Sequence, residues 1–357
     1  MMKTVLLSLS ALALISTVAQ AQDVFWRDSN DGTVGANWVG GFGFGGGETP
    51  GASNTAVISG SDVLDTTVIY VDSAVTSPAG LEFRDRGATL QIRSGGSLAS
   101  GALVLRNTFD EGAFNLSIQG GTFTLNSTAW SAGNRLNLTV SSGNMVFNPG
   151  GNNSNGLIQG DSIVSISGGT VELGDARITL TDVSNFNWTG GTLSNVNRFQ
   201  GDGVASQTLT NGGGTFFVNT NTRTDDFMGY NNGTGTTAFA INADGTTDAE
   251  LSQYTGGEAW DLTTGIVAVD FGSGYTPLIG DSWDFTDLSA GTDFLGSTAN
   301  IASTSADGNW NVTWDTSSWV SDGVLGITNV TVIPEPSTAV LLGLGLFGLM
   351  AGRRRRA

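Results

Sequence analysis

The side chains that could carry chemistry in this chain are carboxylates and arginines. The 357 residues contain no His and no Cys, which excludes imidazole bases, Ser-His-Asp triads, disulfides and thiolate metal sites. Asp225 and Asp226 lie beside Arg223, so they supply the acid, base and cation that a polysaccharide lyase or hydrolase would need. An Arg-Asp-Arg run at 84–86 is a second such group.

Neither group converges on a single site without a turn, because adjacent residues of a strand point to opposite faces of the sheet. Because the chain has 32 acidic residues, some of them lie near an arginine by chance. We therefore name no catalytic residue and no metal ligand, and we predict a chain that is not an enzyme and needs no cofactor. A β-helix polysaccharide lyase or hydrolase stays the alternative.

The charge balance restricts the partners of the chain. Lys and Arg number 14 and Asp and Glu number 32, which gives a net charge of −18. So acidic a surface disfavours nucleic acid and anionic lipid, whose phosphates it repels. Neutral glycans and divalent cations remain open as ligands.

The elements that must position these side chains are short strands with a recurring glycine unit. Its pattern is apolar-x-apolar-x-Gly-Gly-Thr-apolar-x-apolar, as in the segment LSIQGGTFTL at 116–125. The second glycine of each unit, or the residue in its place, is spaced at 25, 22, 26, 22 and 23 residues. These markers are Gly96, Gly121, Gly143, Gly169, Gly191 and Gly214.

A repeat of this length predicts a solenoid, in which stacked units bury the apolar face that no single unit can bury. The alternative is an antiparallel meander with Gly-Gly hairpins, but such hairpins would repeat about every 12 residues. We predict an all-β fold, a right-handed parallel β-helix. An N-terminal cap would occupy 22–60, the coils 61–223 and a β-rich C-terminal cap 224–333.

Side-chain alternation sets the expected core of each coil. In a strand every second side chain points to the same face. Leu116, Ile118, Phe123 and Leu125 should therefore point inward, and the Ser, Gln and Thr between them outward.

The last residues combine three features in order. Pro334, Glu335 and Pro336 precede an uncharged run at 339–352, and Arg353, Arg354, Arg355 and Arg356 follow it. As a helix the run would measure about 21 Å, short of the ~30 Å hydrocarbon core, so we expect a marginal transmembrane helix with its arginines in the cytoplasm. A buried core helix is the alternative, although such a helix rarely ends in four arginines.

The first 21 residues predict a cleaved secretory signal helix. Lys3 precedes an apolar stretch at 5–15, and Ala19 and Ala21 form a small-residue cleavage site for signal peptidase. The apolar stretch is too short for a membrane helix. We expect export through the Sec translocon, which would place 22–333 beyond the inner membrane.

The tail resembles the PEP-CTERM sorting signal of exported proteins in Gram-negative bacteria that make exopolysaccharide. The resemblance implies cleavage near Pro334, Glu335 and Pro336 by a membrane transpeptidase-like exosortase, after transient anchoring in the inner membrane. The glycine units resemble autotransporter-associated β-strand repeats, and segments at 274–277 and 280–283 resemble the closing segment of solenoids with such a tail. Together they indicate a non-enzymatic surface or matrix protein associated with exopolysaccharide, with an adhesin as a further alternative.

Overall fold

The computed structural model is all-β, with 64% of its residues in strands and 3% in helices, so the all-β part of the predicted fold class is confirmed. The structure describes residues 23–26, 36–37, 55–59, 68–75, 79–84, 89–106, 114–126, 136–148, 162–247, 249–254, 256–287, 293–298, 300–305 and 310–332.

Most strands pair in parallel with strands one coil away. One sheet contains β1 (Asp23–Trp26), β3 (Thr55–Ser59), β6 (Gly80–Arg84) and β9 (Leu103–Arg106). The largest sheet follows the order β2 (Ala36–Asn37), β4 (Val68–Val71), β7 (Thr89–Arg93), β10 (Phe114–Leu125), β11 (Leu136–Phe147), β12 (Val164–Thr179), β13 (Phe186–Gln200), β15 (Thr215–Val218), β18 (Thr236–Ile241), β21 (Ile266–Phe271) and β24 (Ile301–Ser305).

Side branches of the largest sheet are β5 (Ala74–Val75), β8 (Ser97–Ser100), β16 (Thr222–Asp225) and β19 (Leu251–Gln253). A further parallel sheet contains β14 (Gln207–Thr210), β17 (Met228–Asn231), β20 (Trp260–Leu262) and β23 (Phe294–Gly296). Parallel pairing between such distant segments makes the chain a parallel β-solenoid of about six turns.

The repeat predicted from the glycine spacing is the coil of this solenoid. Five successive register pairs join adjacent coils just after the glycines. They are Ser97–Thr122, Thr122–Asn144, Asn144–Thr170, Thr170–Thr192 and Thr192–Thr215. Their sequence separations equal the five marker spacings, so the predicted stacking is confirmed and the meander is excluded.

The glycine pair forms a corner inside a continuous strand. Strands β10 to β13 run through their glycines, and the pairing register shifts there. Gly169 has a φ of +71°, and a Cβ on it would lie only 2.4 Å from the carbonyl oxygen of Gly143 in the coil before. Glycine is needed because the backbone is left-handed and the neighbouring coil passes too close for any side chain.

The alternating side chains fill the coils as expected. Leu116, Ile118, Phe123 and Leu125 are all at most 1% exposed. Further down the stack the core becomes aromatic, and the ring centroid of the fully buried Tyr230 lies 5.4 Å from that of Trp260. Full burial of one large apolar side chain contributes about 1.5–3 kcal/mol to the stability of the fold.

Parallel pairing continues past 223, the predicted end of the coils. Strands β18, β21 and β24 extend the largest sheet in parallel. Buried asparagines support the corners on both sides of this boundary: Asn211 Nδ2 donates to the carbonyl of Gly214, the last glycine marker, at 3.0 Å. In the next coil, which lacks the Gly-Gly-Thr marker, Asn232 Nδ2 donates to the Ile266 carbonyl at 2.9 Å. Because an amide side chain satisfies the corner backbone, the coil persists where the Gly-Gly-Thr pattern stops. The strands within 22–60 likewise belong to the stack, since β1 and β3 pair in parallel.

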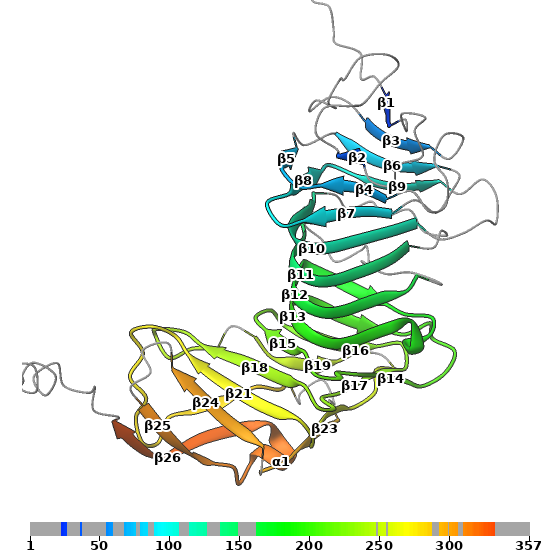
Figure 1. Cartoon of the computed structure of the whole chain (residues 1–357). Coiled ribbons are helices and arrows are strands. Elements are labelled where there is room, and N and C mark those ends of the chain that lie inside the picture. Colours follow the sequence, from blue (N-terminus) through cyan, green and yellow to red (C-terminus); the bar gives the residue numbers. More distant parts are fainter. Residues whose placement is uncertain are drawn as a thin grey trace, which may run out of the picture.

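Figure 1 shows the resulting shape as a column and an arm. The column contains the blue to green strands β1 to β17. The arm contains β18, β21, β24, β25 (Trp310–Asp315) and β26 (Val324–Val332), and it leaves the base of the column at an angle.

An antiparallel sheet and one helical turn close the arm. The sheet has the order β22 (Ser282–Asp284), β26, β25, and the turn is α1 (Trp319–Asp322). Among the residues that the structure describes, the remaining helical element is the 3-10 turn Val183–Asn185. Trp319 is fully buried and packs edge-on against Phe294, with ring centroids 4.9 Å apart. This cover is needed because the last coil would otherwise expose its apolar interior.

The two predicted terminal segments lie outside the described residues. They are the signal peptide at 1–21 with Ala19 and Ala21, and the tail at 334–357, so both terminal helices stay predictions. Among the residues that the structure describes, no helix is long and apolar enough to cross a bilayer.

Candidate functional site

Three arginines form a row across adjacent coils on the outside of the column. Arg177 on β12 is in register with Arg198 on β13, which is in register with Arg223 on β16. Stacked strands lie about 4.8 Å apart, so three like charges come close together. Arg198 Nη1 lies 2.7 Å from Asp225 Oδ2, and Arg177 Nη1 donates to Gln200 Oε1 at 3.1 Å.

A strained turn brings both predicted carboxylates to this row. Asp226 and Phe227 have φ values of +49° and +61°, a left-handed conformation that costs each non-glycine residue about 1–2 kcal/mol. Asp225 accepts from Arg198, and Asp226 Oδ2 accepts from Gln200 Nε2. The turn that sequence reasoning required for convergence is therefore present.

The electrostatics of the row are those of paired groups. Burial raises the pKa of Asp225, as does the neighbouring Asp226 carboxylate, while Arg198 opposes the shift. Burial, followed by repulsion from Arg198, lowers the pKa of Arg223. The Asp225 side chain is only 4% exposed, so its carboxylate is held by an arginine and not presented to a substrate.

The second group predicted from the sequence is the Arg-Asp-Arg run at 84–86. Of the run at 84–86 the structure describes only Arg84, the last residue of β6. No group of three or more His, Cys, Asp or Glu side chains suited to a metal ion occurs among the described residues.

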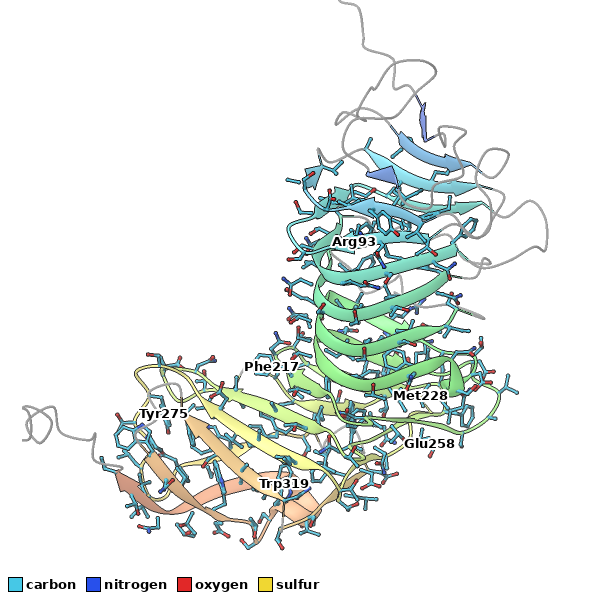
Figure 2. All side chains as sticks on the ribbon, viewed as in Figure 1. Arg93, Phe217, Met228, Glu258, Tyr275 and Trp319 are labelled. Carbon is cyan, nitrogen blue, oxygen red and sulfur yellow. The ribbon has the colours of Figure 1, made fainter. Side chains whose placement is uncertain are left out.

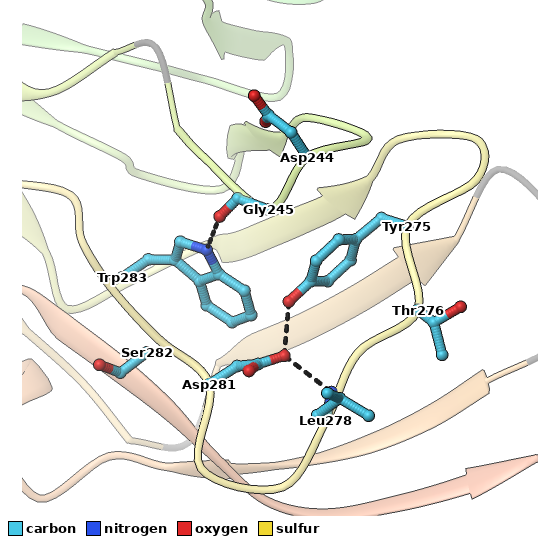
Figure 3. A pocket seen from close by; sticks show the side chains of 8 residues that line it. All are labelled: Asp244, Gly245, Tyr275, Thr276, Leu278, Asp281, Ser282 and Trp283. Atoms are coloured by element: carbon cyan, nitrogen blue, oxygen red, sulfur yellow. Dashed lines mark hydrogen bonds between the residues drawn. The ribbon is translucent and has the colours of Figure 1, made fainter.

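A separate hollow of about 270 Å³ lies on the arm, near the Tyr275 label of Figure 2. It opens between the loop after β18 and the loop that joins β21 to β22. Figure 3 shows its lining, which consists of Asp244, Gly245, Tyr275, Thr276, Leu278, Asp281, Ser282 and Trp283.

Hydrogen bonds fix the polar groups of this hollow. The Tyr275 hydroxyl donates to Asp281 Oδ2 at 2.5 Å, and the Leu278 N–H donates to the same oxygen at 2.7 Å. Trp283 Nε1 donates to the Gly245 carbonyl at 2.8 Å. Burial and then the Asp281 carboxylate raise the pKa of Tyr275, so the phenol stays protonated and keeps its donor role.

The lining offers acceptors and an aromatic ring but no cation. Asp244 lies at the rim, fully exposed, and hydrogen bonds from Thr246 lower its pKa, so it stays ionised at neutral pH. The Tyr275 ring stacks on Phe271 at 5.7 Å between centroids. Such a site suits a small ligand with hydroxyl donors and an apolar face, and it repels anions.

Residues 332–356 match the model of the PEP-CTERM protein-sorting motif. The tail is a PEP-CTERM sorting motif. It indicates export and sorting to the cell surface or exterior, and processing by exosortase, a membrane enzyme. Pro334, Glu335 and Pro336 and the arginines at 353–356 all fall within the PEP-CTERM match.

No curated protein and no solved structure matches the chain. The PEP-CTERM match covers residues 332–356, so it assigns the tail only. The predicted β-solenoid is confirmed, whereas its likeness to autotransporter-associated repeats is not.

Sequence reasoning missed the hollow on the arm and Arg198. The segments at 274–277 and 280–283 resemble the closing segment of a solenoid, so the sequence predicts only a cap there. Their signal was two aromatic residues and an aspartate within nine positions, bounded by turn glycines. Arg198 gave no signal, because its partner Asp225 lies a full coil away.

Proposed function

We propose that this chain is a non-enzymatic β-solenoid that is released or displayed outside the cell and associates there with exopolysaccharide. The match of residues 332–356 to the sorting motif carries the export and sorting part of this proposal. Export would run through the Sec translocon with cleavage after Ala21. Exosortase would then break a peptide bond near Pro334–Pro336. The carbonyl carbon forms a new bond to the oxygen of water or to the nitrogen of an acceptor amine, and the leaving nitrogen takes up the proton that this nucleophile loses.

In cells that contain exosortase, the mature chain should lack Arg353–Arg356, and in cells without the enzyme it should keep them. Intact-mass spectrometry of the secreted and cell-bound fractions measures the difference directly. A mature chain that still carries the four arginines beside active exosortase would refute the proposal.

The engagement of Asp225 by Arg198 supports a structural role for the arginine row, which ties three coils together. A β-helix lyase or hydrolase is the competing assignment, and an adhesin is a second one. Release of reducing sugar or of unsaturated products from a panel of polysaccharides would favour the enzyme. Adhesion to host or partner cells without binding to purified polysaccharide would favour the adhesin.

The hollow on the arm supports the association with exopolysaccharide, because its acceptors and aromatic ring suit a neutral sugar unit. Neutral gluco-, manno- and galacto-oligosaccharides should include one that binds, measured by isothermal titration, while uronic acid oligosaccharides should not bind. Asp281→Asn keeps an acceptor oxygen for Tyr275 and Leu278 but removes the charge, so it should weaken binding by about tenfold.

Asp72→Asn is the matched control for that variant. It removes the same charge from an exposed position next to β4 in the column and should leave binding unchanged. Equal binding of the uronic acid oligosaccharide, or an equal effect of both variants, would count against a sugar site in the hollow.

A further inference from the structure

The folded arm ends very close to the sorting motif. Strand β26 ends at Val332, and Pro334 is two residues further along the chain, at most about 7 Å away at ~3.5 Å per residue. The predicted membrane segment begins at 339, no more than about 25 Å from the arm. An enzyme that cuts near Pro334 must therefore bind the chain within about 7 Å of the folded arm.

Strand β26 is held differently along its length. Its first residues, Val324–Gly326, pair with β22, and Gly326 and Ile327 pair with β25. Ile327 also exchanges backbone hydrogen bonds with Gly280 and Asp281. From Thr328 onward its only strand partner among the described residues is β25. The outer part of β26 thus belongs to a two-stranded ribbon, which is marginally stable by itself.

Side-chain packing anchors this ribbon only up to Val330. Trp314 stacks on Phe271, with ring centroids 5.9 Å apart, and the register pair Val312–Val330 packs against the core. Only two register pairs lie between that pair and the end of β26.

These two outermost pairs are Asn311–Thr331 and Trp310–Val332. Asn311, Thr331 and Val332 are exposed to solvent, and Val332 is the residue next but one to the motif. Trp310, the fourth residue of the two pairs, is half-buried. Its partial burial is the main apolar contact that opposes their separation, so opening should cost less free energy than opening the pairs packed on the core.

We propose that these two pairs must open before exosortase can cut, so that the end of the β25–β26 ribbon gates processing. This inference rests on the proposed processing at Pro334–Pro336. A chain that an enzyme cuts must leave its own sheet before it can lie in the active site, and β26 stays paired with β25 up to Val332. Opening adds Thr331 and Val332 to the accessible segment. When opening is fast compared with the cut, the processing rate follows the population of the open form.

A disulfide across the ribbon tests the gate. The chain has no other Cys, so Asn311→Cys combined with Thr331→Cys creates a single possible bridge between directly opposed residues. After export into an oxidising compartment, processing of the bridged full-length chain should slow by about tenfold or more. A thiol reductant in the medium should restore the rate. The ratio of processed to unprocessed chain in a pulse-chase experiment is the readout.

Two further variants make the result specific. A flexible insert of about six Gly and Ser residues between Val332 and Ile333 supplies extended chain without opening the ribbon, so it should rescue the bridged protein. Asn115→Cys with Asn137→Cys bridges a register pair of β10 and β11 in the column and should leave processing unchanged.

The outcomes separate the gate from the proposed function. Processing of the bridged chain at the wild-type rate, or no rescue by the insert, would overturn the gate while leaving the sorting assignment intact. If the unbridged wild-type chain is itself not cut in the presence of exosortase, both the gate and the proposed processing are refuted.

Discussion

Gly169→Ala is expected to lower the free energy of unfolding by about 3 kcal/mol. Its φ of +71° costs an alanine about 1 kcal/mol. The new Cβ would also lie 2.4 Å from the carbonyl oxygen of Gly143, which forces two coils apart, and overpacking of this kind typically costs a further 1–3 kcal/mol, or about 2. Urea unfolding followed by circular dichroism would measure the loss.

Gly203→Ala is the matched control for this prediction. Gly203 has a nearly equal φ of +74°, but nothing lies within 4 Å of a Cβ built on it. Its substitution by alanine should therefore lower the free energy of unfolding only by the cost of a left-handed backbone, about 1 kcal/mol. Equal losses in the two variants would show that coil-to-coil contact does not explain the glycine at the corner.

Trp319→Ala should cost about 3–5 kcal/mol, the range for removing a fully buried aromatic side chain. Trp319 covers Phe294 and Phe285 at the end of the arm, with ring centroids at 4.9 and 6.4 Å, and Figure 2 labels it there. Its loss would expose the last coil. We expect a lower Tm and faster proteolysis of the arm.

Val320→Ala provides the comparison, because Val320 is the next residue of α1 and is 47% exposed. A surface truncation of this kind should change stability by no more than about 0.5 kcal/mol. If Trp319→Ala behaved like Val320→Ala, the helical turn would not be the element that closes the solenoid.

The glycine units predicted the coil because their chemistry is local. Each corner needs glycine at a fixed place, so the marker spacing equals the pairing register of residues such as Thr122 and Asn144. Buried Asn211 supports the last marked corner, at Gly214, and buried Asn232 supports the next coil, where the Gly-Gly-Thr marker is absent. An isolated Asn has no such meaning in a sequence already rich in Asn, so the full length of the stack could not be predicted.

The arginine row was hidden for a different reason. Arg177 and Arg198 are 21 residues apart, whereas Arg198 and Arg223 are 25 apart. Because coil lengths vary with loop lengths, sequence spacing alone does not show which residues become neighbours. The hollow was equally hidden, because Asp244 and Tyr275 come from loops of different coils.

The central place of β26 in its antiparallel sheet has a mechanical consequence. If the processed end of the chain is joined to the cell surface, any pull on the body enters along β26. That strand is bonded to β22 on one side and to β25 on the other, so a force along its axis loads several hydrogen bonds at once in shear. The body would then resist being pulled away by flow, while the two loose pairs at its tip yield first.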